Sequence, residues 1–462
     1  MSSSAKIKFF SILISVLALG SSFAFDFGGL VTNDTIIKTC KDSKFRLDQK
    51  NSASLWLRQS ISEDGSSYFA AETIYSFERD FDVDSSVNVL DVDLCKLVLK
   101  KPTENGTFGI SAGRFYYSDL TGTIYNQLSD GIEFLYESPV VQVTVYGAYT
   151  GLLNAQNAKM ISSESYTNLA SSRNKAKLNS LVRDKYITEE LSGLVSMMLD
   201  PDMALDKKYD QLKSKKMATP MNLAVINRLT PESDAFYLDS DKVYDMAEKY
   251  AVGSVAIGFP GLIKTQSLSA QFLGAFRLEK SSFNRMYAIL AAEGPIAHSL
   301  YYGVNTSFGF TQYDGSGTEV SNLSKAGLVY YSNFKSASIG LNGVYASCAQ
   351  GGLENFHGIT QVSATYSLRE LQHTGLAKVG LTASIKPVDS LMIIAACDCV
   401  ASAHESDELD EFSYSGMQYA AGVKWQAKSD LMFAASVTQY LSKESCDDMD
   451  KTSFSLSAAL SF

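Results

Sequence analysis

The sequence predicts an all-β protein, a transmembrane antiparallel β-barrel of about 16 to 18 strands that carries a partly helical loop insertion. Three observations predict it. Segments of about ten residues alternate between apolar and polar side chains, the polar faces carry few charges, and short connections alternate with long ones. Together these features are typical of a barrel with lipid outside and water inside.

The alternating segments recur from Leu55 to the end of the chain. Strict alternation indicates a strand with one apolar face, and about ten residues is the length of a tilted membrane-spanning strand. The clearest examples are YFAAETIYSF at 68–77, ESPVVQVTVYGAY at 137–149, TQSLSAQFLGAFRLEK at 265–280, MQYAAGVKW at 417–425, LMFAASVTQY at 431–440 and SFSLSAALSF at 453–462.

The second face of these segments holds Ser, Gln, Thr, Ala and Gly rather than rows of Lys and Glu. Charged residues make up 19% of the chain, whereas roughly 25% is usual in soluble domains. We therefore expect this face to line a wet lumen, although large soluble sheets share the alternation.

Connection lengths give a second indication of a barrel. The turn at 427–430 is short and lies between two long acidic connections, 401–412 and 442–452. Earlier in the chain, we expect a long connection at 315–322 and a short one at 331–336. Short turns on the periplasmic side are typical of outer-membrane barrels. Two short connections in succession, 369–374 and 386–389, break the rule, so one strand there is merged or falsely assigned.

The N-terminus reads as a signal peptide over 1–24. It has Lys6 and Lys8, an apolar run over 9–19 and the small residues Ser22 and Ala24. Removing it takes two of the 40 basic residues and leaves 38 against 50 acidic ones, a net charge of −12. That charge argues against nucleic acid as a partner. No later apolar run reaches the roughly 18 residues of a membrane helix, so residues 25–462 would span a membrane as strands.

Residues 154–249 interrupt the alternation. ITEELSGLVSMML at 187–199 and DSDKVYDMAEKY at 239–250 have helical spacing. Since Ser138-Pro139 reads as a periplasmic turn, the following strand runs outward and the insertion should lie on the extracellular side. The pattern leaves open whether it caps the barrel, enters the lumen as a plug, or is a solvated loop.

With its signal, its strands and its terminal Phe462, the chain resembles bacterial outer-membrane β-barrel proteins, in particular porin-like ones. AGRFYYSDLTGTIYNQLSDGIEF at 112–134 is similar to porin strand and turn sequence. The resemblance implies a location in the outer membrane, contact with its lipid, and a last strand that the barrel assembly machinery reads. The matching positions of this assembly signal are Phe454, Leu456, Ala458, Leu460 and Phe462.

Six cysteines depart from that family. They are Cys40, Cys95, Cys348, Cys397, Cys399 and Cys446, and six cysteines allow 15 pairings. Cys397 and Cys399 share one strand face, with His404 the nearest further ligand. A zinc site needs more ligands than this, so strand packing is the better interpretation and no metal is expected.

Candidate catalytic motifs are weak. GISAG at 109–113 matches a nucleophile elbow, but the following RFYYSD lacks helical spacing, so Ser111 reads as a strand residue. The acidic run 405–411 lacks the pattern of a calcium loop. The four histidines, His298, His357, His373 and His404, have no metal spacing. We therefore expect no cofactor and no enzymatic activity.

Strand parity predicts which polar side chains project into the lumen, where such groups set selectivity. A one-residue slip would reverse each assignment. The function predicted is passive or weakly selective diffusion of small polar solutes through a monomer or homo-oligomer. The alternatives are a membrane-embedded barrel hydrolase or protease and an adhesin or structural barrel with a closed lumen. The pore-lining candidates are Asp91, Asp93, Glu133, Gln271, Arg277 and Lys424.

Overall fold

The computed structural model describes most of the chain from Phe25 onward. The described residues are 25–39, 45–81, 85–153, 249–263, 265–278, 284–312, 318–348, 352–354, 356–360, 373, 375–405, 410–443 and 451–462. The predicted signal peptide over 1–24 and the predicted helices within 154–249 lie outside these residues, except for the end of the second helical segment at 249–250.

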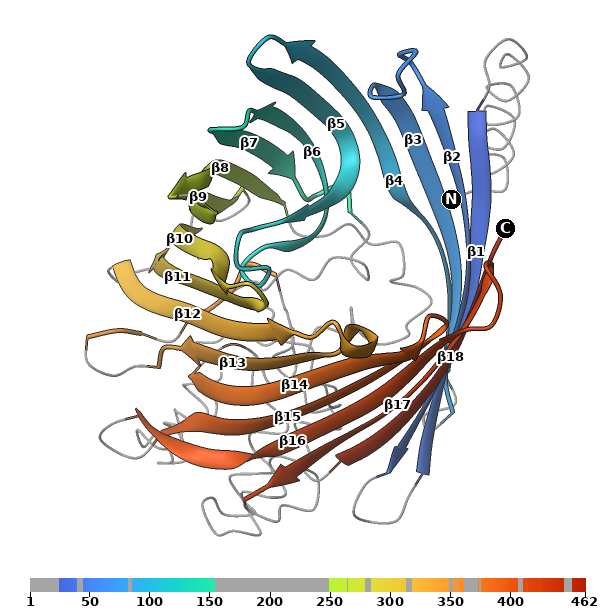
Figure 1. Ribbon diagram of the computed structural model, residues 1–462, viewed down its shortest axis with the longest axis vertical. Helices are drawn as coiled ribbons and strands as arrows, with labels where there is room; N and C mark the ends of the chain where they lie inside the picture. The colour runs from blue at the N-terminus through green and yellow to red at the C-terminus, as the bar shows by residue number, and fades with distance from the viewer. Residues whose placement is uncertain are drawn as a thin grey trace, which may run out of the picture.

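The described residues form one sheet of 18 antiparallel strands (Figure 1). This confirms the predicted all-β barrel and the upper end of the predicted strand count. The strands are β1 (Phe25–Thr39), β2 (Phe45–Ser60), β3 (Tyr68–Asp80), β4 (Ser85–Thr103), β5 (Gly106–Ser118), β6 (Asn126–Glu137), β7 (Gln142–Tyr149), β8 (Tyr250–Ile263), β9 (Gln266–Arg277), β10 (Asn284–Ala297), β11 (Leu300–Gln312), β12 (Thr318–Tyr331), β13 (Ser338–Ala346), β14 (Leu376–Val388), β15 (Leu391–Glu405), β16 (Asp410–Gln426), β17 (Leu431–Ser442) and β18 (Lys451–Ser461). A short 3-10 helix, η2 (Phe334–Ser336), lies between β12 and β13.

The sheet closes because β1 pairs with both β2 and β18. Val31 lies opposite Leu460, and Ile37 lies opposite Phe454. Closure gives every strand two neighbours, so most backbone groups of the wall bond within the sheet, as a lipid environment requires.

The connections differ between the two ends of the barrel. At the turn end, where β18 finishes, they are 61–67, 104–105, 138–141, 264–265, 298–299, 332–337, 389–390 and 427–430. At the loop end they are 40–44, 81–84, 119–125, 150–249, 278–283, 313–317, 347–375, 406–409 and 443–450. The predicted turn at Ser138-Pro139 is confirmed by a hydrogen bond from the Ser138 N–H to the Val141 carbonyl, 2.9 Å.

Three predicted connections need correction. The hairpin β15–β16 continues to the pair Glu405–Asp410, so most of 401–412 is strand. The hairpin β11–β12 begins at the pair Gln312–Thr318, so most of 315–322 is strand. The connection between these two strands is then no longer than the connection 332–337. The stretch 369–374 lies within the single connection 347–375. The prediction was wrong because it took polar sequence to be a loop. The backbone hydrogen bonds between paired strands form whatever the side chains are.

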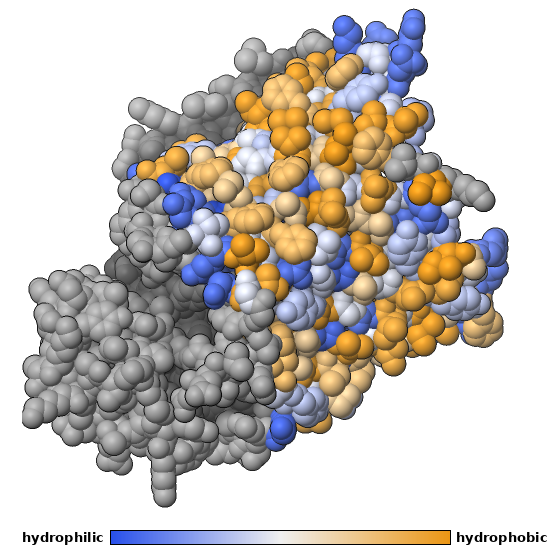
Figure 2. Space-filling model, turned by 90° about the vertical axis from the view of Figure 1, so that its left-hand side faces the viewer, coloured by the Kyte–Doolittle hydropathy of each residue, from blue (hydrophilic) through white to orange (hydrophobic). Residues whose placement is uncertain are grey.

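The outer face is apolar. Exposed side chains on it include Phe272, Phe134, Leu381 and Leu456, each of which alternates with an inward-facing neighbour. In Figure 2, hydrophobic side chains cover most of the described part of the face formed by the strands on the left of Figure 1. Within the described residues, no helix is long and apolar enough to cross a membrane.

The inner face is not uniformly polar, which corrects the expectation of a wet lumen throughout. Near the loop end, inward side chains from β5 to β17 and from two connections pack into a buried apolar cluster. Its members are Phe115, Tyr117, Ile124, Tyr125, Tyr146, Tyr250, Val252, Leu273, Ala275, Tyr287, Ile289, Leu323, Ala346, Phe356, Ile359, Leu376, Val400 and Tyr440. This part of the lumen has a core like that of a soluble domain.

Candidate pore constriction

The wall divides at one place, between β4 and β5. Their pairing runs from the turn end and stops at Cys95–Arg114. Beyond that pair β4 continues along β3, while β5 continues along β6. In Figure 1, β4 runs straight on and β5 curls away from it. Phe115 and Tyr117, the next inward residues of β5, are buried in the lumen cluster.

Two backbone irregularities lie at this division. β4 has a bulge at Asp93, because Glu72 pairs with Leu94 and Thr73 pairs with Val92. On β5, Gly113 has φ +121°, and a Cβ atom there would collide with the Cys95 carbonyl oxygen. A bulge bends and twists a strand, and glycine tolerates this φ without strain. The sequence thus allows β5 to leave the wall at this level.

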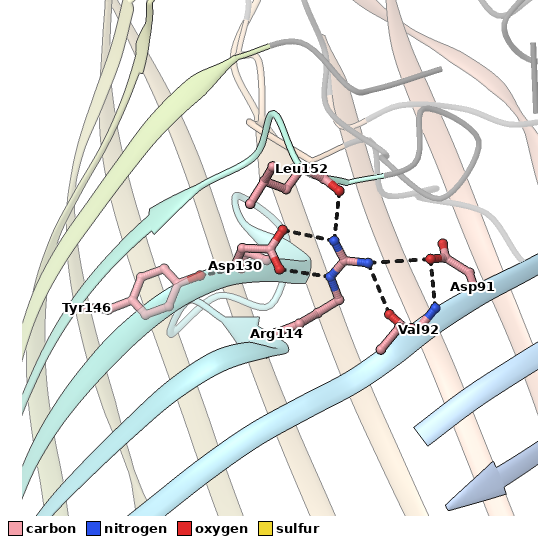
Figure 3. A network of polar contacts seen from close by, with 7 residues as sticks. Asp91, Val92, Arg114, Asp130, Tyr146 and Leu152 are labelled. Carbon is pink, nitrogen blue, oxygen red and sulfur yellow. Dashed lines mark hydrogen bonds and ion pairs between the residues drawn. The ribbon is translucent and has the colours of Figure 1, made fainter. Parts of the chain in front are cut away.

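Arg114 joins the parts that separate (Figure 3). Its Nε and Nη2 donate to the two carboxylate oxygens of Asp130 on β6, at 2.9 and 3.0 Å. Its Nη1 donates to the Val92 carbonyl of β4 at 3.1 Å and approaches Asp91 Oδ1 at 3.4 Å. Nη2 also donates to the Leu152 carbonyl at 2.8 Å. Side-chain exposure is 14% for Arg114 and 20% for Asp130, and bidentate pairs of this kind are among the stronger polar contacts.

The bent end of β5 leads into the connection 119–125, which is ordered by Asp119. The Asp119 carboxylate accepts hydrogen bonds from the N–H groups of Thr121, Ile124 and Tyr125, at 2.6, 3.0 and 2.9 Å. A carboxylate that binds backbone N–H groups of its own turn stabilises a compact loop. We refer to residues 119–125 as the inner loop.

The inner loop reaches strands far from its own hairpin. Lys325 Nζ on β12 donates to the Thr121 carbonyl at 2.9 Å and to Thr123 Oγ1. On β9, Gln271 Oε1 accepts from the Leu120 N–H at 2.8 Å, and its Nε2 donates to Ser254 at 2.8 Å and to the Tyr117 hydroxyl at 3.2 Å. The loop therefore bridges the lumen from β5–β6 to β9 and β12.

A second segment, residues 356–360 between β13 and β14, packs against the inner loop. The N–H groups of Ile359 and Thr360 donate to the Ile124 carbonyl at 2.7 and 2.9 Å. From β10, Arg285 Nη1 donates to the Gly358 carbonyl, and the Tyr287 hydroxyl donates to that of His357. Burial, together with nearby Arg285, lowers the pKa of His357 to about 3. His357 is thus neutral at physiological pH, as its apolar surroundings require.

The structure places the predicted pore-lining residues as follows. Gln271 and Arg277 lie on the inner face of β9 and are buried, with Gln271 bonded to the inner loop. Glu133 lies on the inner face of β6, opposite Ser111 and Tyr146. Lys424 is exposed and has the inward parity of buried Gln418 on β16. Asp91 contacts Arg114 at the division, and Asp93 occupies the bulge. Their role in lining a pore stays a prediction.

Parity analysis missed the residues that shape the constriction. Arg114 has the same parity as the outward residues Ile110 and Tyr116, so parity does not point it into the lumen. Lys325 lies in SNLSKAGLV, a segment without clear alternation. One signal was present: Phe115 and Tyr117 place large aromatic rings on the face of β5 that carries Ser111, opposite the exposed Tyr116.

The structure places the serine and the cysteines of the weak motifs within strands. Ser111 is a buried residue within β5. Cys397 and Cys399 lie on the outer face of β15, opposite Tyr419 and Met417, and their thiols are not in disulfides, as is also true of Cys95. Among the described residues no three His, Cys, Asp or Glu side chains converge in a metal-binding cluster.

No protein-family model matches the chain, and no curated protein matches it. Solved structures do share its fold. Pseudomonas aeruginosa OccK2 (OpdF), determined in complex with glucuronate, has a TM-score of 0.54 and 10% identity over 95% of this chain and 96% of its own. Pseudomonas aeruginosa OccK5 (OpdH) has a TM-score of 0.53 and 8% identity over 95% and 98%. The outer membrane protein OprD of the same organism has 0.52 and 9% over 95% and 93%. The chain therefore has the closed antiparallel fold of porin-like bacterial outer-membrane β-barrels.

Proposed function

We propose that this protein is an outer-membrane channel through which small polar solutes diffuse passively past a constriction. The observation that carries the proposal is the bridge formed by the inner loop and residues 356–360. Lys325, Gln271 and Arg285 tie this bridge to the wall on the side of β9–β12. We place the solute path along the opposite wall, over β17, β18 and β1–β3.

That opposite wall suits water. Its inward side chains include several hydroxylated ones, among which Thr32, Ser52, Ser436 and Ser455 are only half-buried. A narrowed lumen with a polar wall admits small solutes and rejects large ones, which is the arrangement that channel selectivity uses.

Conductance in planar lipid bilayers tests the proposal. Purified, folded protein should give stepwise current increases in KCl that scale with the salt concentration. Heat-modifiable migration in gel electrophoresis verifies that the barrel is folded. Folded protein that gives no conductance at any voltage would refute the channel and favour the closed structural barrel or adhesin.

The competing proposal is a barrel hydrolase, which needs a histidine beside a nucleophile. Ser111 is a strand residue, and His357 packs against Arg285 and Tyr287 with a pKa too low for a general base near neutral pH. These contacts favour the channel.

The proposal includes insertion in the outer membrane with lipid against the apolar outer face. We also propose that Phe454, Leu456, Leu460 and Phe462 serve as the assembly signal. All four are exposed on the outer face of the last strand and its terminus, where an assembly factor can contact them. A homo-oligomer stays a prediction.

A further inference from the structure

The wall that faces the proposed path is lined by paired hydroxyl groups. Thr32 Oγ1 on β1 lies 2.5 Å from Ser52 Oγ on β2. On β17 and β18, Ser436 and Ser455 lie 2.9 Å apart, and Thr438 and Ser453 lie 2.5 Å apart. All alternate with exposed outward residues such as Val31, Leu55, Phe433 and Phe454, so they belong to the inner face.

Beside the first pair lies a hydroxyl group that needs a partner. Ser54 is 4% exposed, is two residues from Ser52 on the same face, and its Oγ has no hydrogen-bond partner within the described part of the chain. A buried hydroxyl without a partner is costly. The Oγ of Ser54 has almost no exposed surface, so a solute hydroxyl could become its partner only if the neighbouring side chains move aside.

Several charged groups on this wall are paired with one another. Lys38 forms an ion pair with Asp48, and Lys50 forms one with Glu78. Asp34 lies directly across from Lys50 in the β1–β2 register. Such pairs leave little net field to attract an ion into the path, whereas an ion must give up hydration to enter a narrow lumen.

Three cations on the far side of the lumen already have partners. Arg285 donates to the Gly358 carbonyl, Lys325 donates to the Thr121 carbonyl, and Lys378 contacts buried Asp398 at 3.1 Å. An anionic solute would have to displace one of these contacts to gain a counter-charge from Arg285, Lys325 or Lys378.

We infer that the channel prefers neutral, polyhydroxylated solutes, of the size of a monosaccharide, to carboxylated solutes of the same size. The inference rests on the proposed channel function. A hydroxyl group both donates and accepts, so each wall pair can exchange a bond with a sugar hydroxyl at little cost. A carboxylate only accepts, and it loses hydration without meeting an uncommitted cation on this wall.

Proteoliposome swelling tests the inference with D-glucose and D-glucuronate, which differ at one carbon. Glucose should enter several times faster. Equal rates, or faster entry of glucuronate, would overturn the inference and leave the channel intact. If the vesicles swell with neither solute although their barrel is heat-modifiable, the channel and the inference are both refuted.

Matched variants locate the effect on this wall. Ser436→Ala with Ser455→Ala should slow glucose about threefold and leave glucuronate unchanged. Thr306→Val with Ser324→Ala is the control, since this pair has the same chemistry at 2.8 Å but lies on the outer face beside exposed Leu290 and Tyr345. Glu78→Gln leaves Lys50 without its ion-pair partner and should raise the glucuronate rate. Loss of glucose flux in the outer-face control, or no response to Glu78→Gln, would contradict the inference.

Discussion

The ring of Phe462 lies over the backbone of Gly29, where the end of the last strand meets the first. The Phe462 N–H donates to the Gly29 carbonyl at 3.0 Å, and the Gly29 N–H donates back at 2.9 Å. A Cβ atom on Gly29 would collide with the Phe462 ring. The ring of Phe462 therefore packs where only glycine leaves room, at the end of the ladder that closes the barrel.

Gly29→Val should impair closure, because the added side chain displaces the ring. We expect less heat-modifiable barrel during refolding into detergent micelles. Gly253→Val on β8 is the control, since no atom lies within 4 Å of a Cβ built there. If both variants refold like the wild type, the contact between the Phe462 ring and Gly29 has no structural importance.

Deleting Phe462 or replacing it with Asp should lower the amount of barrel assembled in cells, while export across the inner membrane continues. The measurement is the ratio of heat-modifiable to unfolded protein in isolated envelopes. Phe334→Asp at the same end of the barrel, exposed and within η2, is the control. Normal assembly without Phe462 would refute the proposed assembly signal.

Arg114→Gln should loosen the bent end of β5. The variant loses the bidentate contact and leaves the half-buried Asp130 carboxylate without its partner, which costs about 2–4 kcal/mol. We expect a noisier and larger single-channel current and a lower temperature for heat modification. Arg114→Lys should be intermediate, because an ammonium group cannot pair with both oxygens in the same way.

The control for Arg114 is Arg58→Gln. Arg58 is near the turn end, donates to the Gly65 carbonyl at 3.1 Å and lies over the Tyr68 ring. Its loss should leave the current unchanged. If Arg58→Gln and Arg114→Gln behave alike, Arg114 has no special part in the constriction.

Lys325→Met should free the inner loop from β12 and increase current fluctuations. Lys424→Met should instead shift the reversal potential in a salt gradient towards cation selectivity, because it removes an inward, exposed positive charge. The two variants therefore distinguish a residue that holds the inner loop from a residue that lines the pore. A Lys424 variant with unchanged selectivity would show that this predicted residue does not line the path.

Acid should release residues 356–360. The pKa of His357 falls from 6.5 in the undocked segment to about 3 when docked, because of burial and Arg285. Docking is therefore most stable above pH 6.5 and weakens as the pH falls towards 3. Between pH 7 and 5 the undocked population should rise roughly 25-fold, visible as more frequent current transitions.

His357→Gln should abolish that pH response, whereas His298→Gln, at the exposed turn between β10 and β11, should preserve it. A response that survives the His357 substitution would assign it to another group.

The sequence was sufficient to predict the barrel because its evidence is local. Each strand, from the one at 68–77 to the last, displays an apolar outer face, and a short turn such as 427–430 marks an end of the barrel. The assignment of faces also held on β9, where Phe272 is outward and Gln271 inward.

The constriction was beyond prediction because it depends on contacts between distant segments. Lys325 and Thr121 are 204 residues apart. The Asp93 bulge also changes parity along β4, so that Leu90 is exposed before it and Leu97 and Leu99 after it. Counting alternate residues does not detect such a change of parity. It also cannot distinguish an apolar face that contacts lipid from one that packs into a core in the lumen.

The bend of β5 has a mechanical consequence. The strand that would narrow the proposed channel is also part of the barrel wall, so the contacts of Arg114 act on the lumen and on the wall at the same place. Mutations that straighten β5 would widen the passage and at the same time bring Phe115–Ser118 back beside β4. We therefore expect the permeability of the channel and the stability of the barrel to change together.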